Sequence, residues 1–420
     1  MLKGKTVVLG VTGSIAAYKI ANLASSLVKL HADVHVIMTK NAANFINPIA
    51  FETLTKNKCM IDTFDRNFIF NVAHVSIADK ADVMLIAPAS ANIIAKMAHG
   101  IADDMLSTTY LAMKCPVIVS PAMNVNMFTN QVVQDNIRTL EKYGVTVIPP
   151  DNGYLACGYT GTGKMPSEQV LLDYILREIA KEKDLTGKKV LVTAGPTRES
   201  IDPVRFITNH STGKMGYAVA RQAMLRGAEV TLVSGPVSIA PPPFIKLVSV
   251  QSAQDMFEAV SANYSDMDII IKTAAIADYT PVSTAVEKIK KSDGDADMAI
   301  PMKRTTDILK WLGEHKRVGQ ILCGFSMETE NMLENSRAKL NKKNADLIAA
   351  NSLRDEGSGF GTDTNHLVLI KKEGVTDLPL LSKADAADKL LDELLTLCNK
   401  LFKPLPNSAE VIFCSSFHKY

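Results

Sequence analysis

One pattern limits what this chain can fold into: a short apolar run that ends in a glycine turn and is followed by apolar residues at helical spacing. Residues 6–10 form such a run, Gly13 and Ser14 lie in the turn, and residues 15–30 carry the helical spacing. A β-branched run that meets glycine predicts a strand and a tight turn. The chain therefore begins with a strand, a turn and a helix, as the units of a parallel α/β sheet do.

The same alternation of strand and helix continues through the first half of the chain. Helical spacing recurs at residues 90–99 and 131–143. Further buried-looking strands are predicted at residues 34–38, 83–87, 117–120 and 145–148. Strands that alternate with helices predict a doubly wound parallel sheet. A loop at residues 149–166 and a charged helix at residues 168–183 close this half.

The pattern then starts a second time. Residues 185–190 (LTGKKV) echo residues 2–7 (LKGKTV) and lead through a strand to Gly195, and residues 215–226 have the spacing of a helix. More strands are predicted at residues 230–233, 269–272, 321–325 and 347–350. We predict two tandem doubly wound, Rossmann-like parallel-sheet domains of the α/β class. They are expected at residues 1–183 and 184–401, followed by a loosely held tail at residues 402–420.

Composition restricts the class of protein. The chain has 420 residues, of which 47% are hydrophobic, and single cores rarely outgrow about 250 to 300 residues, so disorder is excluded and two or three domains are expected. Lys and Arg number 46 against 44 Asp and Glu, which gives a net charge of +2. Nucleic acid and anionic membranes require clustered positive charge, so we expect neither partner.

The sequence shows neither a targeting signal nor a cysteine motif. The N-terminal residues lead directly into an apolar strand without the h-region of a signal peptide, and no apolar stretch approaches the ~20 residues of a spanning helix. The six cysteines are scattered, and no CxxC pair indicates zinc or a redox dithiol. The expectation is a cytoplasmic enzyme.

Two turns of the first half could bind a ligand. The turn at residues 10–14 (GVTGS) offers backbone N–H groups and a helix N-terminus to a phosphate, although many α/β folds need glycine there for steric reasons alone. Residues 87–92 (APASAN) place Ser90 and Asn92 at the carboxyl edge of the sheet, where open α/β folds bind ligands. The alternative for these side chains is a helix N-cap.

Three other side chains of the first half are candidates for chemistry. His74 lies in an otherwise apolar segment and suits a general base near neutral pH, although a lone histidine is more often a core residue. Asn124 lies in a loop after a strand, within residues 121–127 (PAMNVNM). Cys157, in a glycine-rich loop, could donate a proton at neutral pH, although most single cysteines are inert.

Together and in this order, these segments resemble the flavin-containing cysteine decarboxylase family, and most closely the phosphopantothenoylcysteine decarboxylases, over residues 4–166. The resemblance implies a flavodoxin-like fold and FMN as cofactor. It implies FMN contacts from Gly13, Ser14, Thr39, Ser90, Asn92, Ser107 and Thr109. Phe128 and Lys164 stand where the family usually has Trp and Arg, and because Lys lacks the bidentate fork of Arg, substrate affinity is the property affected.

The resemblance also implies roles that the chemistry requires. Loss of CO2 from a cysteinyl carboxylate leaves a carbanion without an electron sink, and oxidation of the thiol to a thioaldehyde by hydride transfer to FMN supplies one. In the family's scheme His74 assists as the base and Asn124 binds the substrate carboxylate. Cys157 then protonates the enethiolate.

The second half carries a different set of polar turns. Residues 193–199 and 209–216 combine glycine turns with hydroxyls and cations, which suits a phosphate-rich ligand; no Walker A motif is present, and ordinary βα loops are the alternative. Asp278 ends a predicted strand, a common place for a magnesium or hydroxyl ligand. Lys339 and Lys343 share a helical face, where like charges repel unless an anion lies between them.

These segments resemble the phosphopantothenate–cysteine ligases over residues 186–400. That family uses CTP and Mg2+ to convert a carboxylate into an acyl-cytidylate, which the amine of cysteine attacks. The resemblance makes Asn209 a holder of the acyl-cytidylate and Asp278 a CTP or magnesium ligand. It makes Lys288, which composition alone would place in a solvated charge run, a catalytic cation for the triphosphate. The implied CTP site comprises Lys272, Thr273, Ala274, Asp278, Lys288, Thr306, Asp307, Ile308, Phe325, Lys339 and Lys343. Ser200 and Thr306 replace prolines of the family and soften the loops.

We therefore expect a bifunctional enzyme of coenzyme A biosynthesis whose substrates are 4′-phosphopantothenate, cysteine and CTP. The resemblance implies a homo-oligomer, with ligase dimers, decarboxylase trimers and assembly up to a dodecamer. Three alternatives stay open: a non-catalytic binding protein, a nicotinamide oxidoreductase, and a chain in which one half alone is active. The oxidoreductase would need a GxGxxG turn, and Gly10 and Gly13 have the wrong spacing for it.

Overall fold

The apolar runs of the first half form a parallel sheet in the computed structural model. Within the described residues this sheet has five strands in the order β2-β1-β3-β4-β5, and every neighbouring pair is parallel. The strands are β1 (Thr6–Val11), β2 (Asp33–Met38), β3 (Val83–Ala89), β4 (Val117–Pro121) and β5 (Thr146–Val147). This is the flavodoxin-like order, whose topological switch point lies between β1 and β3.

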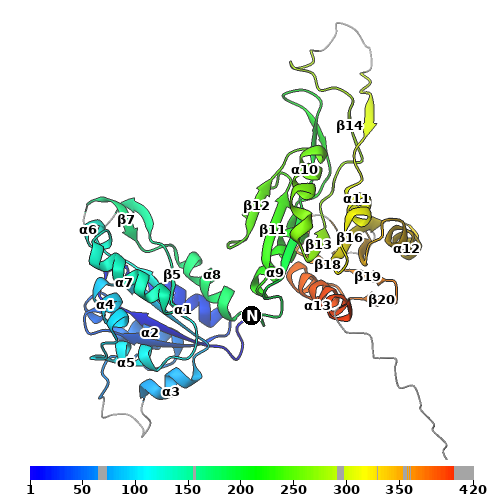
Figure 1. Cartoon of the computed structure of the whole chain (residues 1–420). Helices are drawn as coiled ribbons and strands as arrows, with labels where there is room; N and C mark the ends of the chain where they lie inside the picture. The colour runs from blue at the N-terminus through cyan, green and yellow to red at the C-terminus, as the bar shows by residue number, and fades with distance from the viewer. Residues whose placement is uncertain are drawn as a thin grey trace, which may run out of the picture. The chain divides into compact units, whose positions relative to one another are not determined.

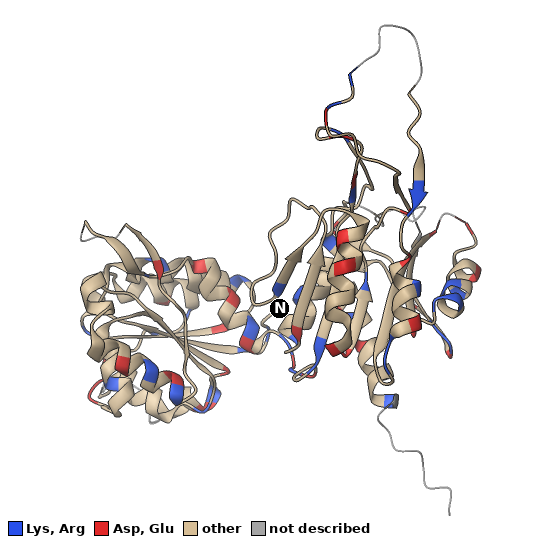
Figure 2. Ribbon diagram, turned by 45° about the horizontal axis from the view of Figure 1, so that its top comes forward, with Lys and Arg blue, Asp and Glu red and all other residues tan. Residues whose placement is uncertain are grey.

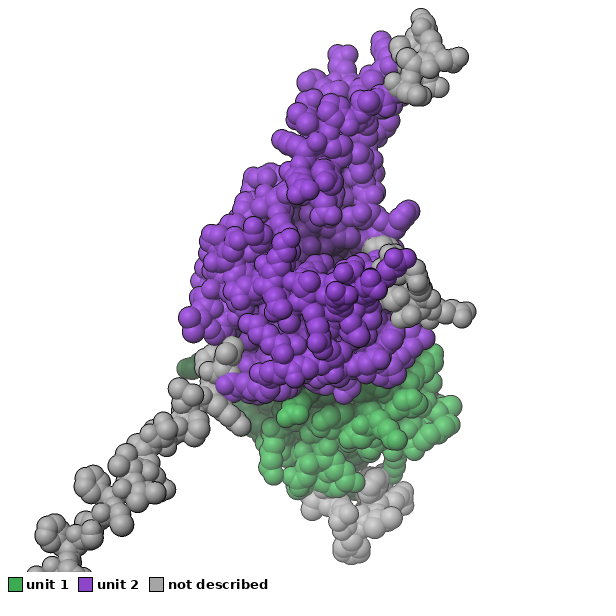
Figure 3. All heavy atoms as spheres, turned by 90° about the vertical axis from the view of Figure 1, so that its right-hand side faces the viewer, with its two compact units in different colours: residues 1–182 green, residues 183–420 purple. Residues whose placement is uncertain are grey.

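Two compact units make up the chain, residues 1–182 and residues 183–420 (Figure 3). The structure describes residues 1–64, 73–154, 158–290, 298–328, 330–352, 357, 359 and 361–401. Acidic and basic residues alternate along the ribbon of each unit (Figure 2). The predicted tail at residues 402–420 lies outside the described residues. In the part of the chain described, no helix is long and apolar enough to cross a membrane.

Helices cover both faces of the first sheet (Figure 1). One layer contains α1, which packs against α2 and α8, and the other contains α4, which packs against α5 and α7. The helical elements are η1 (Ile15–Lys19), α1 (Ile20–Lys29), η2 (Ala42–Asn44), α2 (Pro48–Thr55), α3 (Ala73–Lys80), α4 (Ala91–His99), α5 (Met105–Ala112), α6 (Val125–Phe128), α7 (Gln131–Lys142) and α8 (Glu168–Ile179). The predicted helix at residues 15–30 thus begins as a 3-10 turn. The predicted helix at residues 168–183 ends at Ile179.

The prediction of a loop at residues 149–166 was wrong in part, because the segment contains an antiparallel hairpin of β6 (Asp151–Tyr154) and β7 (Thr160–Lys164). The glycines of this hairpin give it the composition of a loop, but the close packing of the hairpin against residue 123 requires glycine at residue 163. A Cβ on Gly163, whose φ is +146°, would lie 2.4 Å from the Met123 carbonyl oxygen. The backbone N–H of Met123 donates to the Gly163 carbonyl over 3.1 Å. The hairpin therefore lies directly against the segment that holds Asn124.

The second unit is built on a larger, mixed sheet. Its described strands follow the order β12-β11-β8-β13-β16-β17-β19-β20, parallel as far as β17 and antiparallel beyond it. They are β8 (Lys189–Ala194), β11 (Glu229–Ser234), β12 (Lys246–Ser249), β13 (Ile269–Lys272), β16 (Ile321–Glu328), β17 (Leu347–Ser352), β19 (Val368–Lys371) and β20 (Gly374–Asp377). The six parallel strands have the Rossmann order 3-2-1-4-5-6, with the switch point between β8 and β13. The prediction of doubly wound domains is confirmed, and the antiparallel edge is an addition to it.

Helices also cover both faces of the second sheet. On one face α9 (Lys214–Leu225) packs against α13 (Lys383–Leu401), and the other face is covered by α10 (Ala253–Asn263), α11 (Ile308–His315) and α12 (Met332–Lys342). Small two-stranded ladders border the sheet: β9 (Arg198–Ser200) with β10 (Phe206–Thr208), β14 (Tyr279–Pro281) with β15 (Met302–Arg304), and β18 (Thr364–Asn365) with β21 (Leu381–Ser382). A 3-10 turn, η3 (Tyr264–Asp266), follows α10.

A buried arginine joins the beginning of the second unit to its last helix. The Arg226 guanidinium donates to the Asp184 carboxylate at 2.8 Å from its Nε atom. Its Nη1 atom donates to Asp392 Oδ1 at 2.8 Å and to the Asp388 carbonyl at 3.1 Å. Asp184 lies near the start of the unit, whereas Asp388 and Asp392 lie on α13. One side chain therefore fixes segments about two hundred residues apart in the chain.

Candidate functional site

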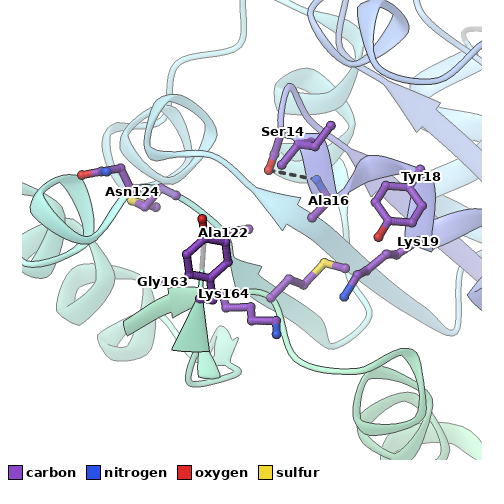
Figure 4. Close-up of a pocket in the computed structure, with 12 residues that line it drawn as sticks. Ser14, Ala16, Tyr18, Lys19, Ala122, Asn124, Gly163 and Lys164 are labelled. Carbon is purple, nitrogen blue, oxygen red and sulfur yellow. Dashed lines mark hydrogen bonds between the residues drawn. The ribbon is translucent and has the colours of Figure 1, made fainter. Parts of the chain in front are cut away.

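A cavity of about 450 Å3 lies in the first unit where the turn after β1 meets the segment after β4 and the hairpin strand β7 (Figure 4). It brings together Ser14 and Asn124, for which the family resemblance implies contacts with FMN and with the substrate carboxylate. Its lining residues are Ser14, Ile15, Ala16, Tyr18, Lys19, Ala122, Met123, Asn124, Tyr154, Gly163, Lys164 and Met165. In Figure 4 the side chains of Lys19 and Lys164 extend toward each other. This pair of cations favours an anionic group of the ligand.

Both predicted residues of this cavity also cap a helix. The Ser14 hydroxyl accepts a hydrogen bond from the Ala16 N–H at 3.4 Å and begins η1. The Asn124 side-chain oxygen accepts from the Asn126 N–H at 2.9 Å and begins α6. The cap role and the ligand role are compatible, because a helix N-terminus is itself an anion site.

Neighbouring strand ends bring together further residues that were assigned to FMN. Gly13 and Ser14 follow β1, Thr39 follows β2, and Ser90 follows β3, which are adjacent strands. Thr12, which sequence reasoning did not single out, joins two of these ends: its hydroxyl donates to the Pro88 carbonyl at 2.7 Å and accepts from the Ser90 N–H at 2.9 Å. Hydroxyl groups and helix N-termini at a flavodoxin-type switch point form a donor set that fits a phosphate.

The remaining side chains of this edge are placed in different ways. The Ser90 hydroxyl accepts from the Ile93 N–H at 3.5 Å and caps α4, as the alternative interpretation expected, and Asn92 is exposed in its first turn. Ser107 and Thr109 are fully buried. The Ser107 hydroxyl bonds to Asp104 in a capping box, and the Thr109 hydroxyl donates to the Met105 carbonyl at 2.6 Å. In the described structure both hydroxyls therefore form hydrogen bonds within α5 and its N-cap residue.

The described residues of the first unit do not bring His74, Asn124 and Cys157, the residues assigned to decarboxylation, together at one cavity. His74 is half-buried in the first turn of α3 and is not among the residues that line the cavity. Cys157 lies outside the described residues. Of the two that are described, Asn124 lines the cavity and His74 does not.

A cavity of about 380 Å3 in the second unit gathers many more of the predicted residues. It lies at the carboxyl ends of β8, β13 and β16 and at the N-terminus of α9. The predicted residues that line it are Asn209, Lys272, Thr273, Ala274, Asp278, Phe325 and Lys339. The Asn209 amide donates to the Ala275 carbonyl at 2.9 Å, which holds it on the rim. Residues up to about 130 positions apart thus share one site.

Other residues of the predicted CTP set lie beside this cavity and do not line it. Thr306 is exposed, and Ile308 is 2% exposed in the hydrophobic core. Asp307 accepts from the Lys310 N–H at 3.0 Å, which caps α11, and forms an ion pair with Lys343. The anion expected beside Lys343 is thus partly supplied by a carboxylate of the chain itself.

The position of Lys288 is set by its neighbour. Lys288 is exposed and does not line the cavity in the described structure. The N–H of Ile289 donates to Asp202 Oδ2 at 3.1 Å, and the Ile289 carbonyl accepts from Arg205 Nη2 at 2.9 Å. The bond from Arg205 holds the pKa of the buried Asp202 carboxyl well below its usual value. The charged pair of Asp202 and Arg205 therefore holds the segment after β14 in which Lys288 lies.

The second cavity is rich in cations. Among the described residues four lysines line it: Lys214, Lys272, Lys339 and Lys383. Burial, and next to it the neighbouring Lys339 cation, lower the pKa of Lys272 to about 8. Burial also lowers the pKa of Lys339, whose ammonium donates to the Phe325 carbonyl at 3.2 Å and to the Ser326 hydroxyl at 3.3 Å. Clustered lysines in a partly desolvated cavity favour a polyanionic ligand.

Sequence reasoning singled out the glycine turn at residues 209–216 without giving a role to its individual glycines, and it missed Lys383. Gly213, with φ +78°, begins α9 without a side-chain cap. A Cβ on Gly216 would lie 2.4 Å from the Thr273 hydroxyl, so glycine is required where α9 meets the sheet. The GKMG spacing at residues 213–216 was a usable signal. Lys383, which comes from α13, has no local signal at all.

The described residues contain no cluster of three or more His, Cys, Asp and Glu side chains that could hold a metal ion. Asp278 is exposed on the cavity wall. Magnesium that arrives with a nucleotide is usually held by one or two carboxylates, the phosphates and water. The donor set at Asp278 therefore fits Mg2+ that is bound together with a triphosphate.

Two doubly wound α/β units, each with a cavity at the carboxyl edge of its sheet, define a two-domain enzyme of the nucleotide-binding α/β class. The family model described as "Flavoprotein" matches residues 1–180, and the model described as "DNA/pantothenate metabolism flavoprotein C-terminal domain" matches residues 185–397.

Relatives match nearly the whole length of the chain. The coenzyme A biosynthesis bifunctional protein CoaBC of Bacillus subtilis (strain 168) is 47% identical over 401 residues, covering 94% of this chain and 98% of the relative. CoaBC of Escherichia coli (strain K12) is 41% identical over 396 residues, with 94% and 98% covered. The crystal structure of a CoaBC C-terminal domain is 46% identical, covers 52% of this chain and 100% of its own, and has a TM-score of 0.45. The chain belongs to the family of bifunctional coenzyme A biosynthesis proteins. The prediction of a two-activity enzyme of this pathway, a ligase and a decarboxylase, is confirmed.

Proposed function

We propose that the second unit joins cysteine to 4′-phosphopantothenate at the expense of CTP, through an acyl-cytidylate, and that the first unit decarboxylates the product to 4′-phosphopantetheine with FMN. Activation is necessary because a carboxylate is a poor electrophile and oxide is a poor leaving group. The observation that best supports the proposal is the second cavity, which gathers an amide, a carboxylate and several lysines from distant segments.

In the ligase reaction the lysines of the second cavity hold the triphosphate. Lys272 is the last residue of β13, and Lys339 lies on α12. Both ammonium groups are partly desolvated, which strengthens their attraction for the phosphates. Lys288 also binds the triphosphate when the segment after β14, held by Asp202, lies over the nucleotide. Asp278 takes Mg2+, which accompanies the phosphates. Asn209 holds the acyl-cytidylate at the rim until the amine attacks.

In the decarboxylase reaction the first cavity orients the substrate. Asn124 and Lys164 bind its carboxylate, and Lys19 adds positive charge beside them. FMN supplies two-electron redox chemistry when it is bound at the strand ends that carry Ser14, Thr39 and Ser90. His74 removes a proton and Cys157 returns one.

We also propose that the enzyme is a cytoplasmic homo-oligomer, in the dimeric and trimeric contacts that the resemblance implies. Support comes from the first cavity, where the large apolar side chains of Ile15 and Tyr18 are each 56% exposed. Exposed apolar side chains beside a site mark a surface that a further partner could cover.

The test is mass spectrometry of the purified protein incubated with 4′-phosphopantothenate, cysteine, CTP and Mg2+. CMP, the cysteine conjugate and 4′-phosphopantetheine are followed together. All three products are expected. The conjugate without 4′-phosphopantetheine would refute the decarboxylase half of the proposal for this protein, provided that the absorbance of bound flavin is present. Absence of CMP would refute the ligase half.

A further inference from the structure

A cluster of charged side chains joins two helices of the first unit and does not line its cavity. The ammonium of Lys96, in the last turn of α4, forms ion pairs with the carboxylate of Asp103 at 2.6 Å and with that of Asp104 at 2.9 Å. The two aspartates directly precede α5, and Asp104 is its N-cap residue. The Lys96 side chain is 16% exposed, so these pairs are less screened by solvent than surface pairs are. The cluster therefore holds the start of α5 against α4.

The Asp104 carboxylate serves both helices. Its Oδ2 atom accepts from Lys96, whereas its Oδ1 atom accepts from the Ser107 N–H at 2.8 Å and from the Ser107 hydroxyl at 2.9 Å. The Ser107 hydroxyl also accepts from the Asp104 N–H at 3.2 Å, which completes a capping box. We call Lys96, Asp104 and Ser107 the α4–α5 network. Because one carboxylate carries both sets of bonds, a change in the ion pair is transmitted to the cap of α5.

Both helices of the α4–α5 network reach the strand ends at which FMN is proposed to bind. Helix α4 begins at Ser90, whose N–H donates to the Thr12 hydroxyl in the turn after β1. Helix α5 contributes Leu106, which is fully buried beside Gly10, near the end of β1. A Cβ on Gly10 would lie 2.6 Å from a methyl carbon of Leu106. Leu106 is therefore packed directly against the backbone that leads into the glycine turn of residues 10–14.

The charged members of the network keep their charge although they are partly buried. Burial disfavours the charged form of Lys96, but bonds from Asp103 and Asp104 outweigh this effect and raise its pKa. Burial likewise disfavours the charged form of Asp104, but bonds from Ser107 and Lys96 outweigh it and lower the pKa of that carboxyl. Removal of either partner leaves the other as an uncompensated charge in a partly desolvated place. The start of α5 is then expected to shift.

The network lies too far from the strand ends to bind the cofactor itself. An α-helix rises about 1.5 Å per residue, so Lys96 lies about 9 Å along α4 from Ser90. Ser107 is fully buried, and its hydroxyl is bonded within the network. The resemblance implies an FMN contact for Ser107, and the capping box offers a different reason for a hydroxyl at this position. Any effect of the network on FMN must therefore pass through the two helices.

We propose that Lys96, Asp104 and Ser107 are positioning residues of the flavin site and do not touch the cofactor. They fix α5 against α4, which holds Leu106 against the turn of residues 10–14 and keeps the start of α4 beside that turn. A phosphate site that is formed before its ligand arrives binds it with a smaller loss of conformational entropy. This assignment rests on the proposed FMN-dependent function and extends it to residues outside the cavity.

The test measures the binding of FMN, and of riboflavin, which lacks the phosphate, to the full-length protein by titration of flavin fluorescence after bound flavin has been removed. Lys96→Met removes the cation, whereas Asp104→Asn removes the anion and keeps an equally good N-cap. Each variant should raise the Kd of FMN about tenfold, which is about 1.4 kcal/mol, and should change the Kd of riboflavin much less. The double variant should resemble the single ones, because each already breaks the same pair. Lys96→Arg, which keeps the charge, should bind FMN as the wild type does.

Thermal unfolding and a control variant separate this role from others. Asp135→Asn makes the same chemical change in an exposed ion pair of α7 and should alter neither Kd. A loss of affinity shared equally by FMN and riboflavin, or a lower Tm with an unchanged Kd, would overturn the assignment in favour of a purely structural role. An effect of Lys96→Met without one of Asp104→Asn would overturn it in favour of a direct contact. A wild type that binds no FMN would instead refute the proposed flavin function on which the assignment rests.

Discussion

The two units begin alike and end differently. Both open with an apolar strand after a Gly-Lys pair, β1 and β8, and both lead into a glycine turn. The first unit then adds one strand, β2, on one side of its opening strand before the chain crosses over. The second unit adds two, β11 next to β8 and β12 next to β11. The switch point therefore lies between β1 and β3 in one unit and between β8 and β13 in the other. The local start of a doubly wound domain does not determine its strand order, and the order decides which loops meet at the site.

The two cavities also differ in how many of the proposed site residues line them. The described residues of the second unit assemble a cavity from the ends of β8, β13 and β16, the start of α9 and α13. The described residues of the first unit bring only Asn124 of the three proposed catalytic residues to the cavity. The ligase proposal is therefore supported by geometry, and the decarboxylase proposal depends more on the resemblance.

The largest expected effect separates the two activities. Lys288→Gln should abolish most CTP-dependent ligation while leaving decarboxylation of supplied conjugate intact, and Cys157→Ser should do the reverse. Loss of a general acid costs roughly 10²- to 10⁴-fold in rate, and loss of a cation beside a triphosphate is expected to be comparable. Product analysis by mass spectrometry measures both reactions in each variant. Normal 4′-phosphopantetheine formation by Cys157→Ser would remove Cys157 from the mechanism.

A second prediction concerns packing in the second unit alone. In Gly216→Ala the new methyl group would lie 2.4 Å from the Thr273 hydroxyl and 2.6 Å from the Ala194 Cβ atom. Such overpacking is expected to lower the free energy of unfolding by about 1 to 3 kcal/mol and to move α9 away from the cavity. Ligation should fall, and decarboxylation should not.

Calorimetry and the two activity assays check this prediction. Gly374→Ala is the matched control, since a Cβ there has no neighbour within 4 Å. Equal behaviour of the two variants would show that the close approach of α9 to the sheet is not needed for ligation.

The smallest effect is a difference in lysine titration between the units. Lys272 has a pKa of about 8, so close to half of it is neutral at pH 8. In the first unit burial disfavours the charged form of Lys96, but bonds from Asp103 and Asp104 outweigh this effect and raise its pKa. Acetic anhydride at pH 8 should therefore acetylate Lys272 ahead of Lys96, and CTP should protect it. Peptide mapping by mass spectrometry measures the two rates, and equal labelling would contradict the prediction.

The sign of the pH effect on stability follows from the same shift. The folded chain releases the Lys272 proton near pH 8, whereas the unfolded chain keeps it until a pKa of about 10.5. The unfolded state thus binds more protons between these values, and stability gains from this group as pH rises through that window. The gain should be absent in Lys272→Met, as chemical denaturation at pH 8 and pH 10 would show.

The strands that sequence reasoning located are those with continuous apolar runs, because a buried parallel strand must be apolar on both faces. The run at residues 269–272 coincides with β13, and the run at residues 83–87 extends by two residues in β3. The β19–β20 hairpin was missed, because both strands have only four residues and the edge strand β20 alternates between exposed and partly buried residues. The same holds for β6 and β7, whose glycines resemble a loop.

The candidate sites could be predicted only as far as local motifs reach. Asn209 and Asp278 follow strands or turns with visible signals, and the structure places both at one cavity. Asn365 and Lys383 reach the same cavity only because β18 and α13 fold back beside α9, which no short segment encodes. The roles of the site residues stay predictions for the experiments above.

The contacts of Arg226 have a consequence for the order of folding during synthesis. Its carboxylate partners include Asp184, at the start of the second unit, and Asp392, in the last helix. The first unit is complete once Glu182 has left the ribosome, whereas the second cannot close this contact until α13 has emerged. Since N-terminal domains fold first, the flavoprotein half can reach its native state while the ligase half is still open. Protease treatment of ribosome-bound chains that end before residue 383 would reveal this difference as a resistant fragment of residues 1–182.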